Sequence, residues 1–151
     1  MYDKWDLRFL KIAKEVSMWS LDPSTKIGSV IVKDRRILST GYNGFPRNIE
    51  DTLERLSDRE SKYKYMVHGE LNAILNASYH GISLCGATAY VYGLPPCVEC
   101  SKAIIQSGIS VVVSQYAHPL PERWNNSYLL SKEIFEESNI EYKEFEINTL
   151  L

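Results

Sequence analysis

Residues 68–79 read HGELNAILNASY and residues 88–106 read TAYVYGLPPCVECSKAIIQ, and these two stretches decide the fold. In the first, apolar residues recur at helical spacing, which predicts a buried helix over 69–79. The second begins with β-branched and aromatic residues, which predict a strand over 88–92, and its apolar spacing then predicts a helix over 98–106. A helix, a strand and a helix in this order are typical of an α/β protein.

Further elements are expected on both sides of this central unit, and together they predict an α/β fold with three layers (αβα). They are a helix after Asp3, strands over 27–32 and 37–42 that form a hairpin, a short charged helix over 51–60, a strand over 109–114, a helix over 127–137 and a strand over 140–145. We expect a mixed five-stranded sheet with helices on both faces, in which the antiparallel hairpin precedes parallel β-α-β units. Because we find no linker, repeat or low-complexity stretch, we expect a single domain over residues 1–151.

The composition argues against several classes of function. The chain of 151 residues carries a formal net charge of −2, so it lacks the basic character that is typical of proteins that bind nucleic acid. No apolar run approaches the roughly 18–20 residues that span a bilayer, and the charged first residues differ from a signal peptide. We therefore expect a cytoplasmic protein that binds neither nucleic acid nor a membrane.

The cysteines favour a metal site over disulfides. There are three, an odd number, and two of them form the C-x2-C pair Cys97 and Cys100. Together with His68 they offer one imidazole and two thiolates, which are typical zinc ligands, and three ligands leave a fourth tetrahedral position for water. Structural zinc sites usually fill all four positions with protein ligands, so an open shell indicates catalysis. The third cysteine, Cys85, is expected to be an ordinary core thiol.

Glu70 is the expected proton carrier of such a site. It follows His68 by two residues and is not needed as a ligand, while zinc lowers the pKa of a bound water from 15.7 to about 7. A carboxylate beside that water is suited to take its proton and pass it on. The pattern H-x-E followed by P-C-x-x-C is typical of zinc-dependent nucleobase deaminases. Alone, C-x2-C could be a redox pair and H-x-E a structural coincidence, but in this order they are far more specific.

At this point the sequence resembles the cytidine deaminase superfamily and, within it, the deoxycytidylate (dCMP) deaminases. Beyond the two motifs, the resemblance rests on DPSTKIG at 22–28, GYNGFP at 41–46 and IIQSGI at 104–109. It implies the cytidine deaminase-like fold and one catalytic Zn2+ ion per chain. By this resemblance the zinc ligands are His68, Cys97 and Cys100, and the proton shuttle is Glu70.

The resemblance also implies the contacts with the substrate. Asn43 would reach the deoxyribose or the phosphate, and Ser24, Thr25 and Lys26 would receive the 5′-phosphate. The small residue Gly69 would let the backbone N–H approach the base. Two alternatives stay open: a plain turn or cap for the serine and threonine, and a left-handed turn for the asparagine.

The activity that the resemblance implies is the hydrolytic deamination of dCMP to dUMP and ammonia, which supplies dUMP for dTMP synthesis. It further implies a homohexamer regulated by dCTP and dTTP. Another zinc deaminase, acting on cytosine, on cytidine or CMP, or on tRNA adenosine, is an alternative, as is a non-catalytic zinc- or nucleotide-binding module. The charge argues against tRNA, and the retained Glu70 argues against a non-catalytic module. The charged stretch 51–65 is interpreted as a solvated helix, a subunit contact or part of an effector site.

Overall fold

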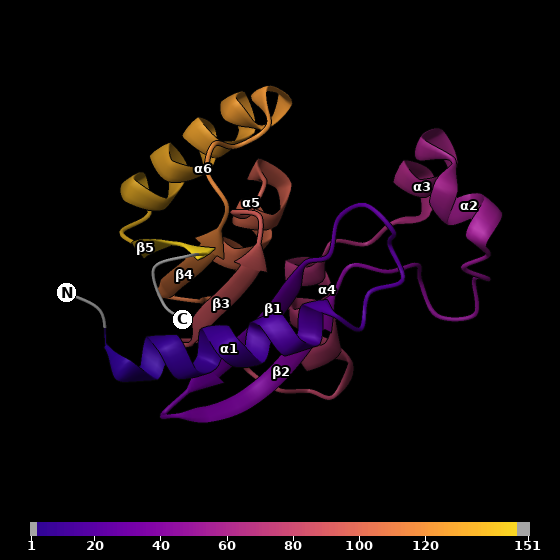
Figure 1. Cartoon of the computed structure of the whole chain (residues 1–151). Helices are drawn as coiled ribbons and strands as arrows, with labels where there is room; N and C mark the ends of the chain where they lie inside the picture. The colour runs from indigo at the N-terminus through magenta and orange to yellow at the C-terminus, as the bar shows by residue number, and fades with distance from the viewer. Residues whose placement is uncertain (1–2, 148–151) are drawn as a thin grey trace.

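Five strands form one mixed sheet in the computed structural model, which describes residues 3–147 (Figure 1). In the sheet order β2-β1-β3-β4-β5, β1 is antiparallel to both β2 and β3, whereas β3, β4 and β5 are parallel. The strands are β1 (Gly28–Lys33), β2 (Arg36–Tyr42), β3 (Thr88–Gly93), β4 (Val111–Tyr116) and β5 (Glu141–Glu146). The predicted hairpin followed by parallel units is therefore confirmed.

Helices cover both faces of the sheet. Successive residues of a strand point to opposite faces, so the strands offer apolar side chains on both of them. Helix α1 (Lys4–Ser17) packs on one face, where its apolar residues form a core with Val30 and Val113. Helices α4 (Gly69–Tyr79), α5 (Val98–Gln106) and α6 (Asn125–Glu137) pack on the other. There they meet the neighbouring residues Ile31 and Val112. The expected three-layer α/β fold is confirmed.

Two glycines let helices on opposite faces lie directly against the strands. A Cβ atom on Gly28 would lie 2.0 Å from the carbonyl oxygen of Ala13 in α1. A Cβ atom on Gly41 would lie 2.2 Å from the backbone nitrogen of Ala73 in α4. No larger side chain fits between backbones at such distances, so these two positions set how closely α1 and α4 approach the sheet.

The charged stretch after β2 forms two short helices instead of one. Helix α2 (Leu53–Ser57) ends and helix α3 (Arg59–Tyr65) begins at Asp58, whose carboxylate accepts a hydrogen bond from the backbone N–H of Ser61 at 3.2 Å. An aspartate that caps a new helix in this way interrupts the preceding one. In Figure 1 the two helices stand away from the sheet.

Three further details differ from expectation. The strand expected over 109–114 begins at Val111, because Ile109 is buried in the connection from α5 and does not join the ladder. A 3-10 turn, η1 (Glu122–Trp124), precedes α6 and was not expected. The prediction that Cys85 is a core thiol is wrong: it is exposed, in the turn between α4 and β3, where Lys33 donates a hydrogen bond to its carbonyl oxygen. Among residues 3–147, no helix has the length and apolar character needed to span a membrane.

Candidate active site

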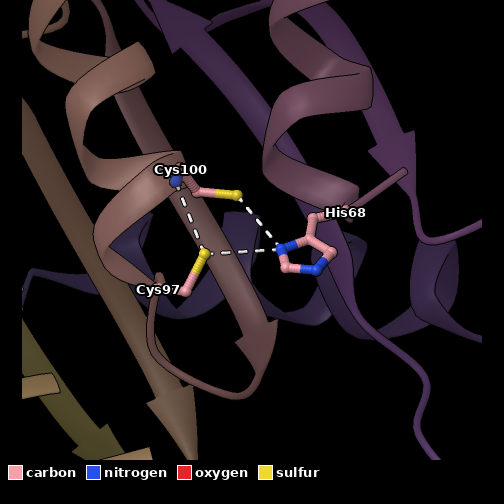
Figure 2. A group of neighbouring side chains, drawn as sticks. All are labelled: His68, Cys97 and Cys100. Carbon is pink, nitrogen blue, oxygen red and sulfur yellow. Dashed lines mark hydrogen bonds between the residues drawn. The ribbon is translucent and has the colours of Figure 1, made fainter. Parts of the chain in front are cut away.

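His68, Cys97 and Cys100 meet between the starts of two helices (Figure 2). His68 is the N-cap residue of α4 and Cys97 the N-cap residue of α5. The histidine Nδ1 lies 3.4 Å from the Sγ of each cysteine. The structure thus brings together the three side chains that the sequence predicted as metal ligands, although they come from segments about 30 residues apart.

The loop that carries the cysteines is fixed by α6. The hydroxyl of Ser131 donates to the carbonyl of Pro96 at 3.0 Å, and the hydroxyl of Ser127 accepts from the backbone N–H of Val98 at 2.9 Å. Inside the loop, the sulfur of Cys97 accepts from the backbone N–H of Cys100 at 3.4 Å. The start of α5 therefore has partners for backbone groups that a helix terminus leaves unpaired.

The geometry of the three ligand atoms fits zinc. Zn–S bonds of about 2.3 Å and Zn–N bonds of about 2.0–2.1 Å imply ligand-to-ligand separations of roughly 3.5–3.8 Å in a tetrahedron. The observed N-to-S distances of 3.4 Å are close to that range, and the three ligand atoms all lie within 4.8 Å of one another. One imidazole and two thiolates hold a divalent zinc ion without excess charge and leave one coordination position open.

Hydrogen bonds among the three predicted ligands stabilise Cys97 as a thiolate even without a metal ion. Hydrogen bonds from the Cys100 thiol and from His68 hold the pKa of Cys97 well below its ordinary value, although burial acts to raise it. The hydrogen bond to Cys97 also raises the pKa of His68. The same bond to Cys97, together with burial, raises the pKa of Cys100. A metal ion that binds here displaces the remaining protons, as is usual for zinc sites.

Glu70 lies in the first turn of α4 and is only 5% exposed. Burial raises its pKa to about 7, partly opposed by the nearby His68. A carboxyl group with such a pKa can both accept and donate a proton at neutral pH, which is what general acid–base catalysis requires. The carboxylate that the sequence singled out is therefore buried beside the candidate metal ligands.

His68 and Glu70 also line a pocket that opens toward solvent. The pocket wall comes from the loop before β1, from the end of β2, from α3 and the residues after it, and from the segments that follow β3 and β4. Its lining residues are Asp22, Thr25, Ile27, Asn43, Lys62, Tyr63, Met66, His68, Glu70, Leu94, Pro95, Arg123 and Trp124. A ligand in this pocket can therefore reach the candidate metal centre.

Asn43 and Thr25, two of the five predicted substrate contacts, line this pocket. The amide oxygen of Asn43 accepts from the backbone N–H of Ile27 at 2.8 Å, and its NH2 group donates to the carbonyl of Thr25 at 2.8 Å. The Asn43 side chain thus holds the loop that carries Thr25. Its contact with a substrate stays a prediction.

Ser24, Lys26 and Gly69, the other three predicted contacts, do not line the pocket. The Ser24 hydroxyl donates to Asp22 at 3.0 Å and accepts from Lys62, which does line it, at 2.7 Å. The ammonium group of Lys26 donates to the carbonyl oxygen of Ser20. Gly69 is buried at the start of α4, where an added Cβ would lie 3.1 Å from the Ile27 carbonyl oxygen. The substrate roles of these three residues stay predictions.

Sequence reasoning missed the side chains of the pocket's outer wall, which we define as Lys62, Tyr63, Arg123 and Trp124. They come from α3 and η1, two segments about 60 residues apart. The only available signal was a basic residue and an aromatic residue side by side in each segment. Such pairs are common on protein surfaces, so neither was distinguishable without the tertiary structure.

Comparison with known proteins agrees with this site. The family model for the cytidine and deoxycytidylate deaminase zinc-binding region matches residues 3–115. An uncharacterized deaminase of Aliivibrio fischeri is 38% identical over 142 residues, covering 93% of each chain. A probable deoxycytidylate deaminase of Drosophila melanogaster is 38% identical over 156 residues, covering 94% of this chain and 72% of the relative.

A solved structure agrees with the fold. The crystal structure of the dCMP deaminase from the cyanophage S-TIM5, in complex with dCMP and dUMP, superposes with a TM-score of 0.77. The sequence identity is 23%, and the match covers 96% of this chain and 99% of the other. At this identity the likeness shows the fold, and it confirms the cytidine deaminase-like architecture expected from the sequence.

Proposed function

We propose that this chain, which belongs to the cytidine and deoxycytidylate deaminase zinc-binding family, hydrolyses dCMP to dUMP and ammonia. The observation that carries this proposal is the buried carboxyl group of Glu70 beside a three-ligand cluster, in the wall of a pocket open to solvent. Relatives from Drosophila and mouse, each 38% identical to this chain, bear the name deoxycytidylate deaminase, the Drosophila one as probable. Their name supports dCMP over the other substrates of zinc deaminases.

In this proposal His68, Cys97 and Cys100 hold one zinc ion per chain. When bound, zinc supplies an acidified water and stabilises negative charge that develops beside it. Glu70 takes a proton from the attacking water and delivers it to N3 of the cytosine ring, which makes C4 more electrophilic. It then takes the proton of the new C4 hydroxyl group and passes it to the amino group, which departs as ammonia and leaves a C4 carbonyl. At C4 a C–O bond replaces a C–N bond, and no oxidant or reductant is needed.

The environment of Glu70 supports this double role. Its burial raises the pKa to about 7, so the group can hold or release a proton near neutral pH. The surrounding pocket contains the apolar side chains Ile27, Met66 and Leu94, which limit the water around the reacting carbon. With fewer water molecules near Glu70, exchange of its proton with solvent competes less with transfer to the substrate.

Several finer roles belong to the same proposal. Asn43 would contact the sugar or the phosphate, Gly69 would admit the base, and Ser24, Thr25 and Lys26 are the residues that the sequence resemblance offers for the 5′-phosphate. The protein would act as one domain in a cytoplasmic homohexamer controlled by dCTP and dTTP. A sigmoidal rate curve that dCTP makes hyperbolic would support this control, and a hyperbolic curve unmoved by either nucleotide would exclude it.

The test is a comparison of substrates with the zinc-loaded protein. We would quantify bound zinc and follow ammonia release from dCMP, deoxycytidine, CMP and cytosine side by side. Fast turnover of dCMP with about one zinc ion per chain is the expected result. Turnover of cytosine alone would contradict the nucleotide proposal, and a zinc-loaded protein inactive on all four substrates would contradict the enzymatic one.

A further inference from the structure

We infer that Lys62 and Arg123 bind the 5′-phosphate of the substrate and so decide the preference for a nucleotide over a nucleoside. The inference rests on the proposed function, since it names the residues that recognise one part of the proposed substrate. It differs from the expectation that Ser24, Thr25 and Lys26 receive this group.

The first argument is where charge lies in the pocket. Among the residues that the structure describes, Lys62 and Arg123 are the lysine and arginine side chains of the pocket, and Asp22 and Glu70 are its carboxylates. Glu70 is 5% exposed, whereas Arg123 is exposed and the Lys62 side chain is 14% exposed. The cations are thus nearer to solvent than the carboxyl group assigned to the chemistry. A nucleotide with its base at Glu70 would place its phosphate toward them.

The second argument is that the Lys62 ammonium group is held in place by two hydrogen bonds and keeps a third N–H group for a ligand. Its Nζ lies 3.2 Å from Asp22 Oδ1 and 2.7 Å from Ser24 Oγ, so two of its three N–H groups have partners. An ammonium group fixed in this way loses less conformational entropy when a ligand arrives than a free surface lysine does. The phosphate would take the third N–H group.

The negative charge of Asp22 does not prevent Lys62 from attracting the phosphate. Although burial acts to raise its pKa, hydrogen bonds from the backbone N–H groups of Ser24 and Thr25 hold the pKa below its ordinary value. Those bonds measure 2.9 and 3.2 Å, and the amide of Asn43 adds a longer contact of 3.4 Å to the other oxygen. The negative charge is thus shared among several donors. Asp22 acts as a positioning residue for Lys62.

The third argument is that the Arg123 side chain makes no hydrogen bond or ion pair with any other residue among residues 3–147. The neighbouring Trp124 anchors η1, because its indole N–H donates to the carbonyl of Pro95 at 3.4 Å. A guanidinium group that lines a pocket from an anchored turn is suited to bind a phosphate through two parallel hydrogen bonds.

Lys26, by contrast, is poorly placed for this role. It does not line the pocket, and its ammonium group donates to the carbonyl of Ser20. To reach the pocket it would have to give up that bond. The geometry therefore favours two cations distant in sequence over the lysine that lies next to Ser24 and Thr25.

The test measures binding without turnover. Zinc-loaded wild-type protein and the variants Lys62→Met and Arg123→Met are titrated with dUMP and with deoxyuridine in a calorimeter. A hydrogen bond to a charged group contributes about 1.5–3 kcal/mol. Each variant should therefore lower the affinity for dUMP by roughly 10- to 100-fold more than the affinity for deoxyuridine. Lys62→Arg should retain most of the preference.

Lys64→Met provides the matched control. Lys64 lies on the same helix, its side chain is 67% exposed, and within residues 3–147 its one ion pair is with Glu60 at 3.5 Å. It does not line the pocket, so its replacement should leave the preference for dUMP unchanged. Circular dichroism checks that each variant is folded. If Lys62→Met fails to fold, Arg123→Met, on a different segment, carries the test alone.

The outcomes separate this inference from the proposed function. The phosphate assignment would be overturned by variants that bind dUMP as tightly as the wild type does. It would also be overturned by variants whose affinities for dUMP and deoxyuridine fall by the same factor, even if the wild type deaminates dCMP. A wild type that binds dUMP through Lys62 and Arg123 but does not deaminate dCMP would keep the assignment and overturn the proposed reaction. Competition by inorganic phosphate at millimolar concentration, lost in both variants, would further support the subsite.

Discussion

The two ends of the pocket are built differently. At the inner end, His68 and Cys97 each cap a helix that packs on the sheet, and Glu70 is buried in the first turn of α4. At the outer wall, Lys62 lies on α3, a helix with no buried residue, and Arg123 on a three-residue turn. Proton transfer and metal binding need positions fixed to within tenths of an ångström, which a packed core provides. Phosphate recognition tolerates more movement, and surface segments held by a few polar contacts suffice.

The sharpest test of the inner end is Glu70→Gln. Amide for carboxylate keeps the shape and removes the proton carrier, so turnover of dCMP should fall by about 10²- to 10⁴-fold. Zinc content, measured by atomic absorption, should stay at the wild-type level because Glu70 is not one of the three ligands. A variant with near-full activity would show that another group carries the proton.

Gly41→Ala tests whether α4 must lie directly on β2. The added methyl group would overlap the backbone of Ala73, at 2.2 Å from its nitrogen, and overpacking of this kind costs about 1–3 kcal/mol. We expect the free energy of unfolding in urea to fall by that amount or more, and dCMP turnover to fall because α4 carries His68 and Glu70. Gly44→Ala is the control, since its φ lies outside the left-handed region and a Cβ there would meet only the Tyr42 ring, at 3.7 Å, an ordinary contact. If Gly41→Ala is as stable as Gly44→Ala, α4 is free to move outward.

Asp22→Asn tests the ion pair between Asp22, in the loop before β1, and Lys62 of the outer wall. The pKa of Asp22 is lowered in the folded protein, so its charge stabilises the fold above the ordinary carboxyl pKa of about 3.9. That contribution is lost as the pH falls through the lower, folded-state pKa. The variant should therefore be less stable than the wild type at pH 6, and the difference should shrink toward pH 3 in urea titrations. A difference that is constant with pH would exclude the charge as its source.

The smallest effect is expected at the exposed Leu53 of α2, and the buried Leu56 of the same helix provides the contrast. Leu53 is 74% exposed, so Leu53→Ser should change the free energy of unfolding by no more than about 0.5 kcal/mol. Leu56, in the same helix, is 5% exposed, and Leu56→Ala should cost about 2 kcal/mol or more. If both substitutions are neutral in thermal unfolding, the pair α2–α3 contributes nothing to the cooperative fold.

Much of the inner end could be predicted from local sequence. The ranges of α4 and α5 agree with the expected helices over 69–79 and 98–106. The apolar spacing of each helix begins directly after a motif residue, His68 or Cys97, so both starts could be predicted. Both helices pack on the same face of the sheet, and the structure brings His68 and the two cysteines together there. Their role as zinc ligands stays a prediction, as does the role of Glu70.

The outer wall was decided by tertiary structure alone. Nothing local distinguishes Lys62 from the other charges between 51 and 65, or Arg123 from any arginine in a polar turn. Equally, no local signal showed that Cys85 is exposed, that Asp58 divides a helix, or that Lys26 turns toward Ser20. Periodicity and capping act over a few residues, so the sequence by itself determined the helices, the strands and the two motifs at the starts of α4 and α5. Which distant side chains share a pocket depends on how those elements pack, and that only the folded chain decides.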